Sequence, residues 1–388
     1  MLRILHDTHF QFMKYRRFWL SLSTALNLAA IALIVFGPGF NYGVDFAGGT
    51  QLTLKFKSEP DQARVRSALE SLKLGAVSIQ RFDEPERHEL LVRVQNPGQE
   101  GDYSGQMLAV LDREFNAKDA AIRLNLQGVD TVRDALVQAD PDRIGGTVEA
   151  RRAHYEPMAK AMLELRKKKG IFTGPSDLEQ VGELSPAVRS LLADSARFGE
   201  FSVLAVDNVG PAVGKDLRKK ATYAIVFSLA GMLIYMWFRF QLQYGIAAVA
   251  ALVHDTLMAL GALSLTGREI EIPTVAALLT VVGYSINDKV VVFDRVRERL
   301  KLDRGKPLVE IMDVSINQTL SRTIITGGGT LMVLIALYFF GGDVINTFAF
   351  VLLLGILVGT YSSIYIASPI ALAVTEWREK RKLARRRR

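Results

Sequence analysis

The chain has 388 residues, of which 49% are hydrophobic and 23% are charged, and its formal net charge is +8. The apolar residues gather in long blocks, whereas the charged residues gather in one middle segment and at the two ends, which excludes both a single soluble domain and a disordered chain. The sequence contains no cysteine, which excludes disulfides, thiolate nucleophiles and cysteine-ligated metal sites.

Six apolar segments are long enough to cross a bilayer, which takes roughly 20 residues per helix. We expect transmembrane helices at 19–36, 223–238, 244–265, 272–293, within 314–340, and at 344–374. Pro369 should bend the last helix, because proline cannot donate a backbone hydrogen bond. The first segment could instead be a cleaved signal peptide. Its apolar run is long for one, and no small-x-small cleavage site precedes Gly37, so an uncleaved anchor is favoured.

Lysine and arginine residues indicate how the spans are oriented. They are dense before the first span, in 295–306 and after residue 377, and sparse in 266–271 and 341–343. Alternating the spans places every basic connection on one side, so both termini are predicted to be cytoplasmic. The position of this charge beside apolar blocks favours a membrane protein and no nucleic-acid partner. The predicted regions are 1–37 (cytoplasmic N-terminus and first span), 38–217 (outside domain), 218–376 (five spans) and 377–388 (basic cytoplasmic tail).

The outside segment has the pattern of a small α+β domain. Apolar spacing predicts, in order, a strand (51–56), a helix (63–72), two strands (77–82 and 89–94) around an Asp83-Glu84-Pro85 turn, and a helix (106–115). A last strand at 201–206 would complete the ferredoxin-like β-α-β-β-α-β order.

Residues 116–199 are expected to form an insertion in this domain. It should be mostly helical, with helices at 131–138, 148–169, 175–181 and 186–196. The part from 170 to 192 vaguely resembles helix-hairpin-helix modules, which often bind DNA. A plain amphipathic hairpin is the preferred interpretation.

Ionisable side chains inside membrane spans are costly and usually functional. Asp255 lies in the third predicted span, Asp288 in the fourth, and Arg322 at the start of the apolar part of the fifth. Asp288 and Arg322 should lie at similar depths from the cytoplasmic end and can pair. A buried carboxylate whose cationic partner shifts can take up and release a proton, so this pair is the candidate for proton coupling.

A permanent ion pair that only fixes the helix register is the alternative for Asp288 and Arg322. For Asp255, a structural hydrogen bond and a role in the proton relay remain equally open. His254 is expected to be a packing residue or to form an interhelical hydrogen bond.

Asp45 lies in a glycine-rich stretch, 43–49, that could be taken for a phosphate-binding loop. No Lys-Ser/Thr follows it, so Gly48 and Gly49 are interpreted as residues that turn the chain from the first span into the first strand. Walker motifs, a GxSxG elbow and a convincing catalytic triad are missing from the sequence, so an ATPase or hydrolase is disfavoured and no cofactor is expected.

Four motifs together resemble the SecF family of bacterial protein-export subunits. They are YGVDFAGGT (42–50, with Asp45, Gly48 and Gly49), VGPAVGKDL (209–217, with Gly210, Pro211 and Gly214), GYSINDKVVVFDRVR (283–297, with Gly283 and Asn287) and SINQTLSRTIIT (315–326, with Asn317 and Gln318). The resemblance covers about 17–115 and 200–376.

The resemblance implies a six-span bundle of the RND type that works with SecD in the bacterial inner membrane. It further implies proximity to the SecYEG channel and, indirectly, to the SecA ATPase, and use of the proton gradient to pull or release exported polypeptides. Asp288 and Arg322 match the family's residues for proton coupling.

The sequence departs from the family pattern in two places. Lys289 stands where the family usually has a small hydroxyl residue, so either its charge acts on Asp288 or its side chain snorkels to the cytoplasmic interface. The insertion 116–199 has no counterpart in the usual short domain, and its basic helix, 151–169, motivates the expectation that it contacts SecD or exported chains.

Two other functions were weighed against the family's. The chain could be a passive membrane scaffold whose buried charges only lock the packing. It could also be part of an RND-type pump for small molecules, which is disfavoured because such pumps usually carry both bundles in one chain.

Overall fold

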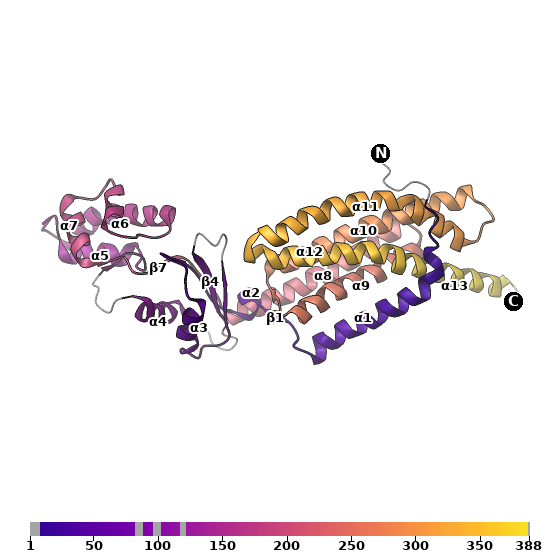
Figure 1. Ribbon diagram of the computed structural model, residues 1–388, viewed down its shortest axis with the longest axis horizontal. Coiled ribbons are helices and arrows are strands. Elements are labelled where there is room, and N and C mark those ends of the chain that lie inside the picture. The colour runs from indigo at the N-terminus through magenta and orange to yellow at the C-terminus, as the bar shows by residue number, and fades with distance from the viewer. Residues whose placement is uncertain (1–7, 82–87, 96–101, 117–121, 387–388) are drawn as a thin grey trace. The chain divides into compact units, whose positions relative to one another are not determined.

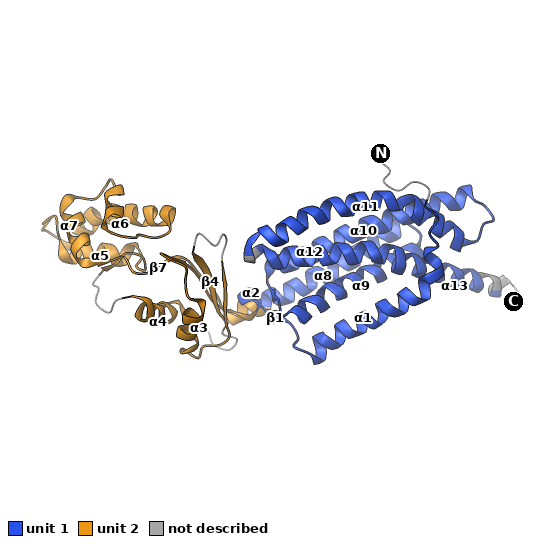
Figure 2. Ribbon diagram, in the orientation of Figure 1, with its two compact units in different colours: residues 1–46, 216–388 blue, residues 47–215 orange. Residues whose placement is uncertain are grey.

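The computed structural model describes residues 8–81, 88–95, 102–116 and 122–386 (Figure 1). The chain divides into two compact units, Met1–Phe46 with Asp216–Arg388, and Ala47–Lys215 (Figure 2). Long helices make up the first unit, whereas the second contains a sheet and shorter helices.

Within the described ranges, six helical stretches are long and apolar enough to cross a membrane. They are α1 (Arg16–Phe36) after the short η1 (Phe12–Tyr15), α8 (Pro211–Arg239), α9 (Leu242–Thr266), α10 (Ile272–Leu302), α11 (Leu308–Phe340), and a continuous stretch made of α12 (Gly342–Ser362), η4 (Ser363–Ala367) and α13 (Ser368–Arg386). All six predicted segments are confirmed as helices. The helices are longer than the apolar runs, because their ends continue beyond the apolar core.

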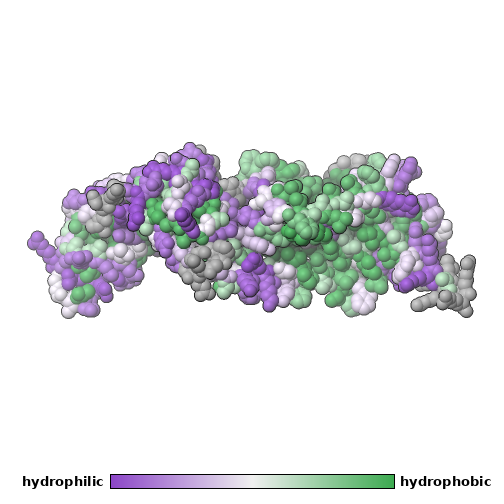
Figure 3. Space-filling model, turned by 90° about the horizontal axis from the view of Figure 1, so that it is seen from below, coloured by the Kyte–Doolittle hydropathy of each residue, from purple (hydrophilic) through white to green (hydrophobic). Residues whose placement is uncertain are grey.

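The six stretches differ in how much of their surface is covered. In their most apolar parts, 50–56% of the residues of α9, α10 and the α12–α13 stretch are buried, against 6–17% for α1, α8 and α11. α9, α10 and the α12–α13 stretch therefore form the middle of the bundle. Seen from the α1 side, the helical unit presents a broad apolar band (Figure 3), as expected of helices that face lipid.

The last stretch is irregular near Pro369, where a bend was predicted. η4 is a π-helical segment that ends two residues before Pro369, and the Ser368 hydroxyl donates to the Ser363 carbonyl at 2.9 Å. Proline removes one helical hydrogen bond, which the chain accommodates here by a wider turn. Such segments often occur near functional sites, and this one directly follows Ser362.

The second unit contains the predicted ferredoxin-like arrangement. Its antiparallel sheet has the order β3-β4-β2-β7, and α3 and α4 pack against the strands (Figure 1). The bounds are β2 (Gly49–Phe56), α3 (Gln62–Glu70), β3 (Val77–Arg81), β4 (Glu89–Gln95), α4 (Ser104–Phe115) and β7 (Phe201–Val209). Alternating side chains of β2 and β4, such as Leu52, Leu54 and Val92, form the core with Met107 and Leu111 of α4. The predicted Asp83-Glu84-Pro85 turn lies outside the described residues.

The inserted segment forms a helical subdomain with its own apolar core. Its elements are β5 (Ile122–Arg123), α5 (Val129–Ala139), α6 (Val148–Lys169), the 3-10 helix η3 (Pro175–Gln180), α7 (Pro186–Ser195) and β6 (Ala196–Arg197). Tyr155, Phe172 and Leu192 are at most 1% exposed, and each such side chain contributes about 1.5–3 kcal/mol on burial. Gly170, with φ +86°, ends α6 as predicted. The helical prediction is therefore confirmed for the described part of 116–199.

Candidate functional site

A cluster of buried polar side chains lies inside the helical unit, where α9, α10 and α12 meet. Asp255 of α9 and Lys289 of α10 form an ion pair with Nζ 2.9 Å from Oδ2, and their side chains are 1% and 0% exposed. Ser285 and Ser362 donate to the same oxygen at 2.5 and 2.8 Å, and His254 Nδ1 lies 2.9 Å from the other oxygen. Four polar partners thus compensate the buried charge of Asp255.

Lys289 is held by the same cluster. Besides Asp255, its Nζ donates to Ser362 Oγ at 3.0 Å and to Ser285 Oγ. The expectation that Lys289 snorkels to the interface is therefore wrong, because four acceptor atoms, including the Ser285 carbonyl at 3.3 Å, satisfy the ammonium inside the bundle. For His254, the predicted packing role agrees with its burial and with a ring contact to Tyr361 of α12, but its hydrogen bond goes to the adjacent Asp255 and does not cross to another helix.

Two glycines of α12 allow this cluster to form. A Cβ at Gly359 would lie 2.8 Å from Ser285 Oγ, and one at Gly355 would lie 2.7 Å from Val281 Cγ1. The backbone of α12 therefore packs directly on α10, as small residues four apart permit in membrane helices. This close approach brings Ser362 to Asp255.

Asp288 is buried beside this cluster, with 4% of the residue exposed, but it is poorly compensated. Thr360 Oγ1 lies 3.5 Å from Asp288 Oδ2, at the limit of a hydrogen bond. Over the described ranges, no cationic nitrogen lies within 4.0 Å of the Asp288 carboxylate oxygens, so Asp288 forms no ion pair there. Burying a carboxylate so weakly paired is costly, and binding a proton removes most of that cost.

The predicted Asp288–Arg322 ion pair is not formed in this chain. The Tyr284 hydroxyl donates to Thr330 Oγ1 at 3.2 Å, which sets the antiparallel register of α10 against α11. Counting four residues along each helix places Asp288 level with about Thr326, so Arg322 lies about one turn, or about 6 Å, nearer the predicted cytoplasmic end. The depths are close, as predicted. The charges do not meet because Arg322 is exposed on α11.

Exposed polar and small residues lie on α10 and α11, within about one and a half helical turns of the level of Asp288. Gly283 and Asn287 of α10 and Arg322 and Thr326 of α11 are all exposed. A Cβ at Gly283 would have nothing within 4 Å. An arginine near the middle of an apolar helix is costly against lipid. We call these four residues the exposed polar group.

The glycine-rich motif contacts the start of α10 and the start of α8. Asp45, in the single-turn α2 (Val44–Ala47), accepts a hydrogen bond from Ile272 N at 3.1 Å and so caps α10. Gly48 and Gly49 have φ of +81° and +147°, backbone conformations that favour glycine and that suit the predicted turn. A Cβ at Gly48 would lie 2.9 Å from Pro211 Cα, so two of the predicted motifs meet here.

Other predicted motif residues lie in the first turn of α8 and in the first third of α11. Gly214 N donates to Gly210 O at 3.0 Å in the first turn of α8. Asn317 exchanges two hydrogen bonds with the backbone of Phe10, at 3.0 and 2.8 Å. Gln318 accepts from the side chains of Arg295 and Arg299. These residues position segments and take no part in the buried cluster.

The sequence interpretation missed the hydroxyl residues of the cluster. Ser285 lies four residues before Lys289 on the same face of α10, and Ser362 and Thr360 lie in the sixth span. The i, i+4 spacing of a serine and a lysine inside an apolar helix was a usable signal. The contribution of α12 had no such signal, because it depends on how the helices pack.

Two family models match the chain. A model described as "Protein export membrane protein SecD/SecF, C-terminal" matches residues 189–377, and one described as "SecD/SecF GG Motif" matches residues 33–59. The second covers Asp45, Gly48 and Gly49, and the first covers α8 to α12 and most of α13.

Curated relatives match over almost the whole chain. The protein translocase subunit SecF of Koribacter versatilis is 37% identical over 389 residues, which cover 98% of this chain and 95% of the relative. This alignment includes the inserted subdomain, which therefore has a counterpart in that relative. SecDF of Thermus thermophilus is 34% identical over 97% of this chain and 40% of the relative.

Solved structures agree with these matches. A crystal structure of SecDF from Thermus thermophilus, titled a translocon-associated membrane protein, superposes with a TM-score of 0.62 at 32% identity and covers 95% of this chain. A second SecDF crystal structure gives a TM-score of 0.57 at 32% identity and covers 98%. The chain spans only 39% and 41% of these SecDF chains.

Proposed function

Because the chain belongs to the SecD/SecF family of protein-export membrane proteins, we propose that it is a multi-pass subunit that works with SecD to assist polypeptide translocation. It uses the proton gradient and acts outside the membrane beside the SecYEG channel, which SecA supplies with exported polypeptides. It lies in the bacterial inner membrane with both termini in the cytoplasm, which the distribution of basic residues supports.

The partnership with SecD is supported by the exposed polar group. Arg322 and Asn287 would contact lipid if the bundle stood alone, at a high cost in free energy. A second bundle that covers α10 and α11 would remove this cost. The SecDF relatives, in which this chain matches only part of a longer chain, support a partnership with SecD.

The observation that carries the proton-coupling role is the weak compensation of Asp288. Its carboxylate is buried with one hydrogen bond of 3.5 Å, so the charged form is costly and proton uptake is favourable. Arg322 lies about one turn away, and its approach would favour proton release. We assign Asp255 a different role: paired with Lys289, it keeps its charge and locks α9, α10 and α12 together.

Asp288→Asn tests this assignment. In vesicles that contain SecD and the Sec channel, we expect export stimulated by the proton gradient to fall to the level measured without a gradient, while co-purification with SecD is unchanged. Asp294→Asn, at a side chain that is 60% exposed, is the matched control and should leave export unchanged. Full gradient-dependent export by Asp288→Asn would remove the coupling role.

A passive scaffold is the second candidate, because the fully paired Asp255–Lys289 cluster is what a structural bundle would contain. It predicts that deleting the inserted subdomain harms export more than Asp288→Asn does. Small-molecule efflux has no comparable support from the site. For the inserted subdomain we propose contact with SecD or exported chains through α6; crosslinks from Lys160, which is 62% exposed, that recover neither would contradict this.

A further inference from the structure

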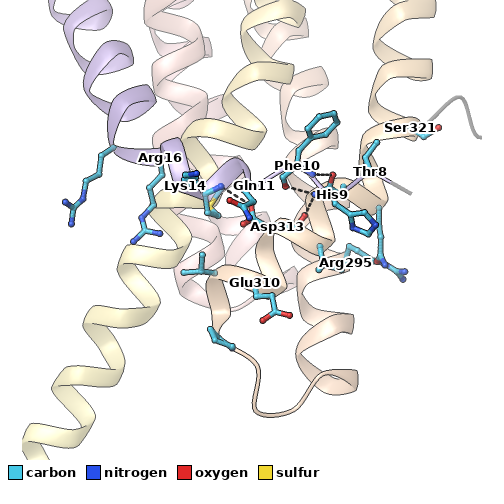
Figure 4. A pocket seen from close by; sticks show the side chains of 17 residues that line it. Thr8, His9, Phe10, Gln11, Lys14, Arg16, Arg295, Glu310, Asp313 and Ser321 are labelled. Atoms are coloured by element: carbon cyan, nitrogen blue, oxygen red, sulfur yellow. Dashed lines mark hydrogen bonds between the residues drawn. The ribbon is translucent and has the colours of Figure 1, made fainter. Parts of the chain in front are cut away.

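An open cavity of about 920 Å³ lies at the end of the helical unit where α1 begins (Figure 4). Its walls are the segment before α1 and the first turns of α11. Lys14, Arg16, Arg17 and Arg295 contribute positive charge to the lining, and two carboxylates, Glu310 and Asp313, contribute negative charge. This end is the one that we assign to the cytoplasm.

The two carboxylates of the cavity are already engaged. Asp313 Oδ1 accepts a hydrogen bond from Met13 N at 2.9 Å, and Glu310 lies 3.5 Å from Lys306 Nζ. Arg295 is likewise occupied, by Glu298 and by Gln318.

The three remaining cations form no close ion pair among the described residues, although the charge of Arg16 acts on Asp313 at longer range. Over the described ranges, Lys14, Arg16 and Arg17 form no ion pair within 4.0 Å. The cavity is therefore left with three positive charges outside any ion pair of those ranges, and Figure 4 labels Lys14 and Arg16 among its lining residues.

An exposed apolar stripe on α1 continues from these cations. Tyr15, Phe18, Leu22 and Leu26 are 57%, 61%, 37% and 45% exposed. Their spacing of three or four residues places them on one face of the helix. Cations beside an aromatic pair, with leucines extending toward the bilayer centre, match the order of phosphate, interface and acyl chain across one leaflet.

We propose that this cavity binds the phosphate headgroup of an anionic phospholipid from the cytoplasmic leaflet. Lys14, Arg16 and Arg17 contact the phosphate, and the acyl chains lie along the face of Phe18, Leu22 and Leu26. A free phosphate ion shares the headgroup chemistry, but it would leave the apolar stripe unused. Basic pockets at the cytoplasmic ends of membrane helices commonly bind such headgroups.

The test compares two double variants that remove the same charge on the same side. Lys14→Gln/Arg16→Gln changes the cavity, whereas Lys301→Gln/Arg304→Gln changes exposed cations that do not line it. Binding of phosphatidylglycerol, with phosphatidylcholine as reference, is titrated on the purified full chain by native mass spectrometry. Each cation near a lipid phosphate contributes about fivefold in affinity, so the cavity variant should bind about 25-fold more weakly and the control within about twofold of the parent.

Several results would overturn the proposal. An equal loss in both variants would indicate general surface charge, and displacement of the lipid by inorganic phosphate would indicate a site for the free ion. Unchanged phosphatidylglycerol binding with loss of SecD co-purification would make the cavity a protein-docking surface. If the double variant does not fold, the single Arg17→Gln, at an exposed side chain, should still weaken binding about fivefold, and no change would count against the site.

Discussion

The Asp255–Lys289 ion pair can be tested by substitutions that remove one or both of its charges and leave Asp288 unchanged. Lys289→Met keeps the length and apolar stem of the side chain but removes the ammonium that lies 2.9 Å from Asp255 Oδ2. The carboxylate would stay buried, with hydrogen bonds from Ser285, Ser362 and His254 but without a countercharge.

The cost of this change follows from the burial of both side chains. Removing one partner of a buried ion pair costs about 3–5 kcal/mol. We expect about 3 kcal/mol, the lower end, because three hydrogen-bond partners of Asp255 remain. At about 2–4 °C per kcal/mol for a unit of this size, the Tm of the helical unit should fall by roughly 6–12 °C.

Thermal unfolding of the purified chain in detergent, followed by tryptophan fluorescence, measures this fall. Asp255→Asn/Lys289→Met removes both charges and should recover about 2 kcal/mol relative to the sum of the two single changes. Asp288→Asn is the matched comparison. Its Tm should be unchanged or higher, since it removes a carboxylate that is buried with little compensation.

Additive effects of the two single changes would show that Asp255 and Lys289 are not coupled, which would refute the interpretation of a fixed pair. A larger fall in Tm for Asp288→Asn than for Lys289→Met would show that the roles of the two carboxylates had been exchanged.

Three further predictions concern other parts of the chain. Gly359→Leu should push α12 from α10 and destabilise the helical unit by about 1–3 kcal/mol in the same unfolding assay, whereas Gly283→Leu, in open space, should leave the Tm unchanged and reduce co-purification with SecD. Burial alone would raise the pKa of Asp177, but hydrogen bonds from Lys169 and Thr173 outweigh burial and lower that pKa. The stability contributed by the Asp177 carboxylate is thus present above about pH 4 and is lost as the pH falls through the lowered pKa. Hydrogen exchange of α6 in the full chain should become faster over this pH range, and Asp177→Asn should remove this pH dependence. Asn317→Ala removes two hydrogen bonds to Phe10 and should speed trypsin cleavage after Lys14 about tenfold; an unchanged rate would mean that Asn317 does not hold this segment.

Hydropathy located the six spans, because a run of apolar residues as long as a bilayer is thick rarely occurs outside membrane helices. It did not locate the ends of the helices. α8 begins at Pro211 and α11 at Leu308, before the predicted starts at 223 and 314. The extra turns of α8 are largely polar, and those of α11 contain Glu310 and Asp313, so neither reads as part of an unbroken apolar run. The ferredoxin-like order was predictable for the same kind of reason, since each strand and helix has its own apolar period.

The partners of the buried charges were not predictable in the same way. Sequence spacing gives the angle between side chains of one helix, but not which neighbouring helix each side chain meets. Lys289 was therefore left with two possible directions, and packing on α9 and α12 decided between them. The predicted ion pair between Asp288 and Arg322 is wrong for a different reason. The Arg322 side chain is exposed on α11, and we expect its polar partner to come from another chain that covers this helix.

The two buried carboxylates, Asp255 and Asp288, have opposite environments. Asp255 pairs with Lys289, whereas Asp288, next to Lys289 in the chain, has no cation close to it among the described residues. Lys289 cannot turn to Asp288 without leaving the charge of Asp255 with no countercharge, because successive residues of a helix point about 100° apart. The fixed pair thus holds α10 in register and withholds its own cation from Asp288. Arg322, about one turn away on α11, is then the remaining cation that acts on Asp288, and we expect its approach to depend on what covers α11. In such a subunit, proton binding at Asp288 would depend on contact with the partner bundle. We therefore expect this chain alone to fold but not to support polypeptide export.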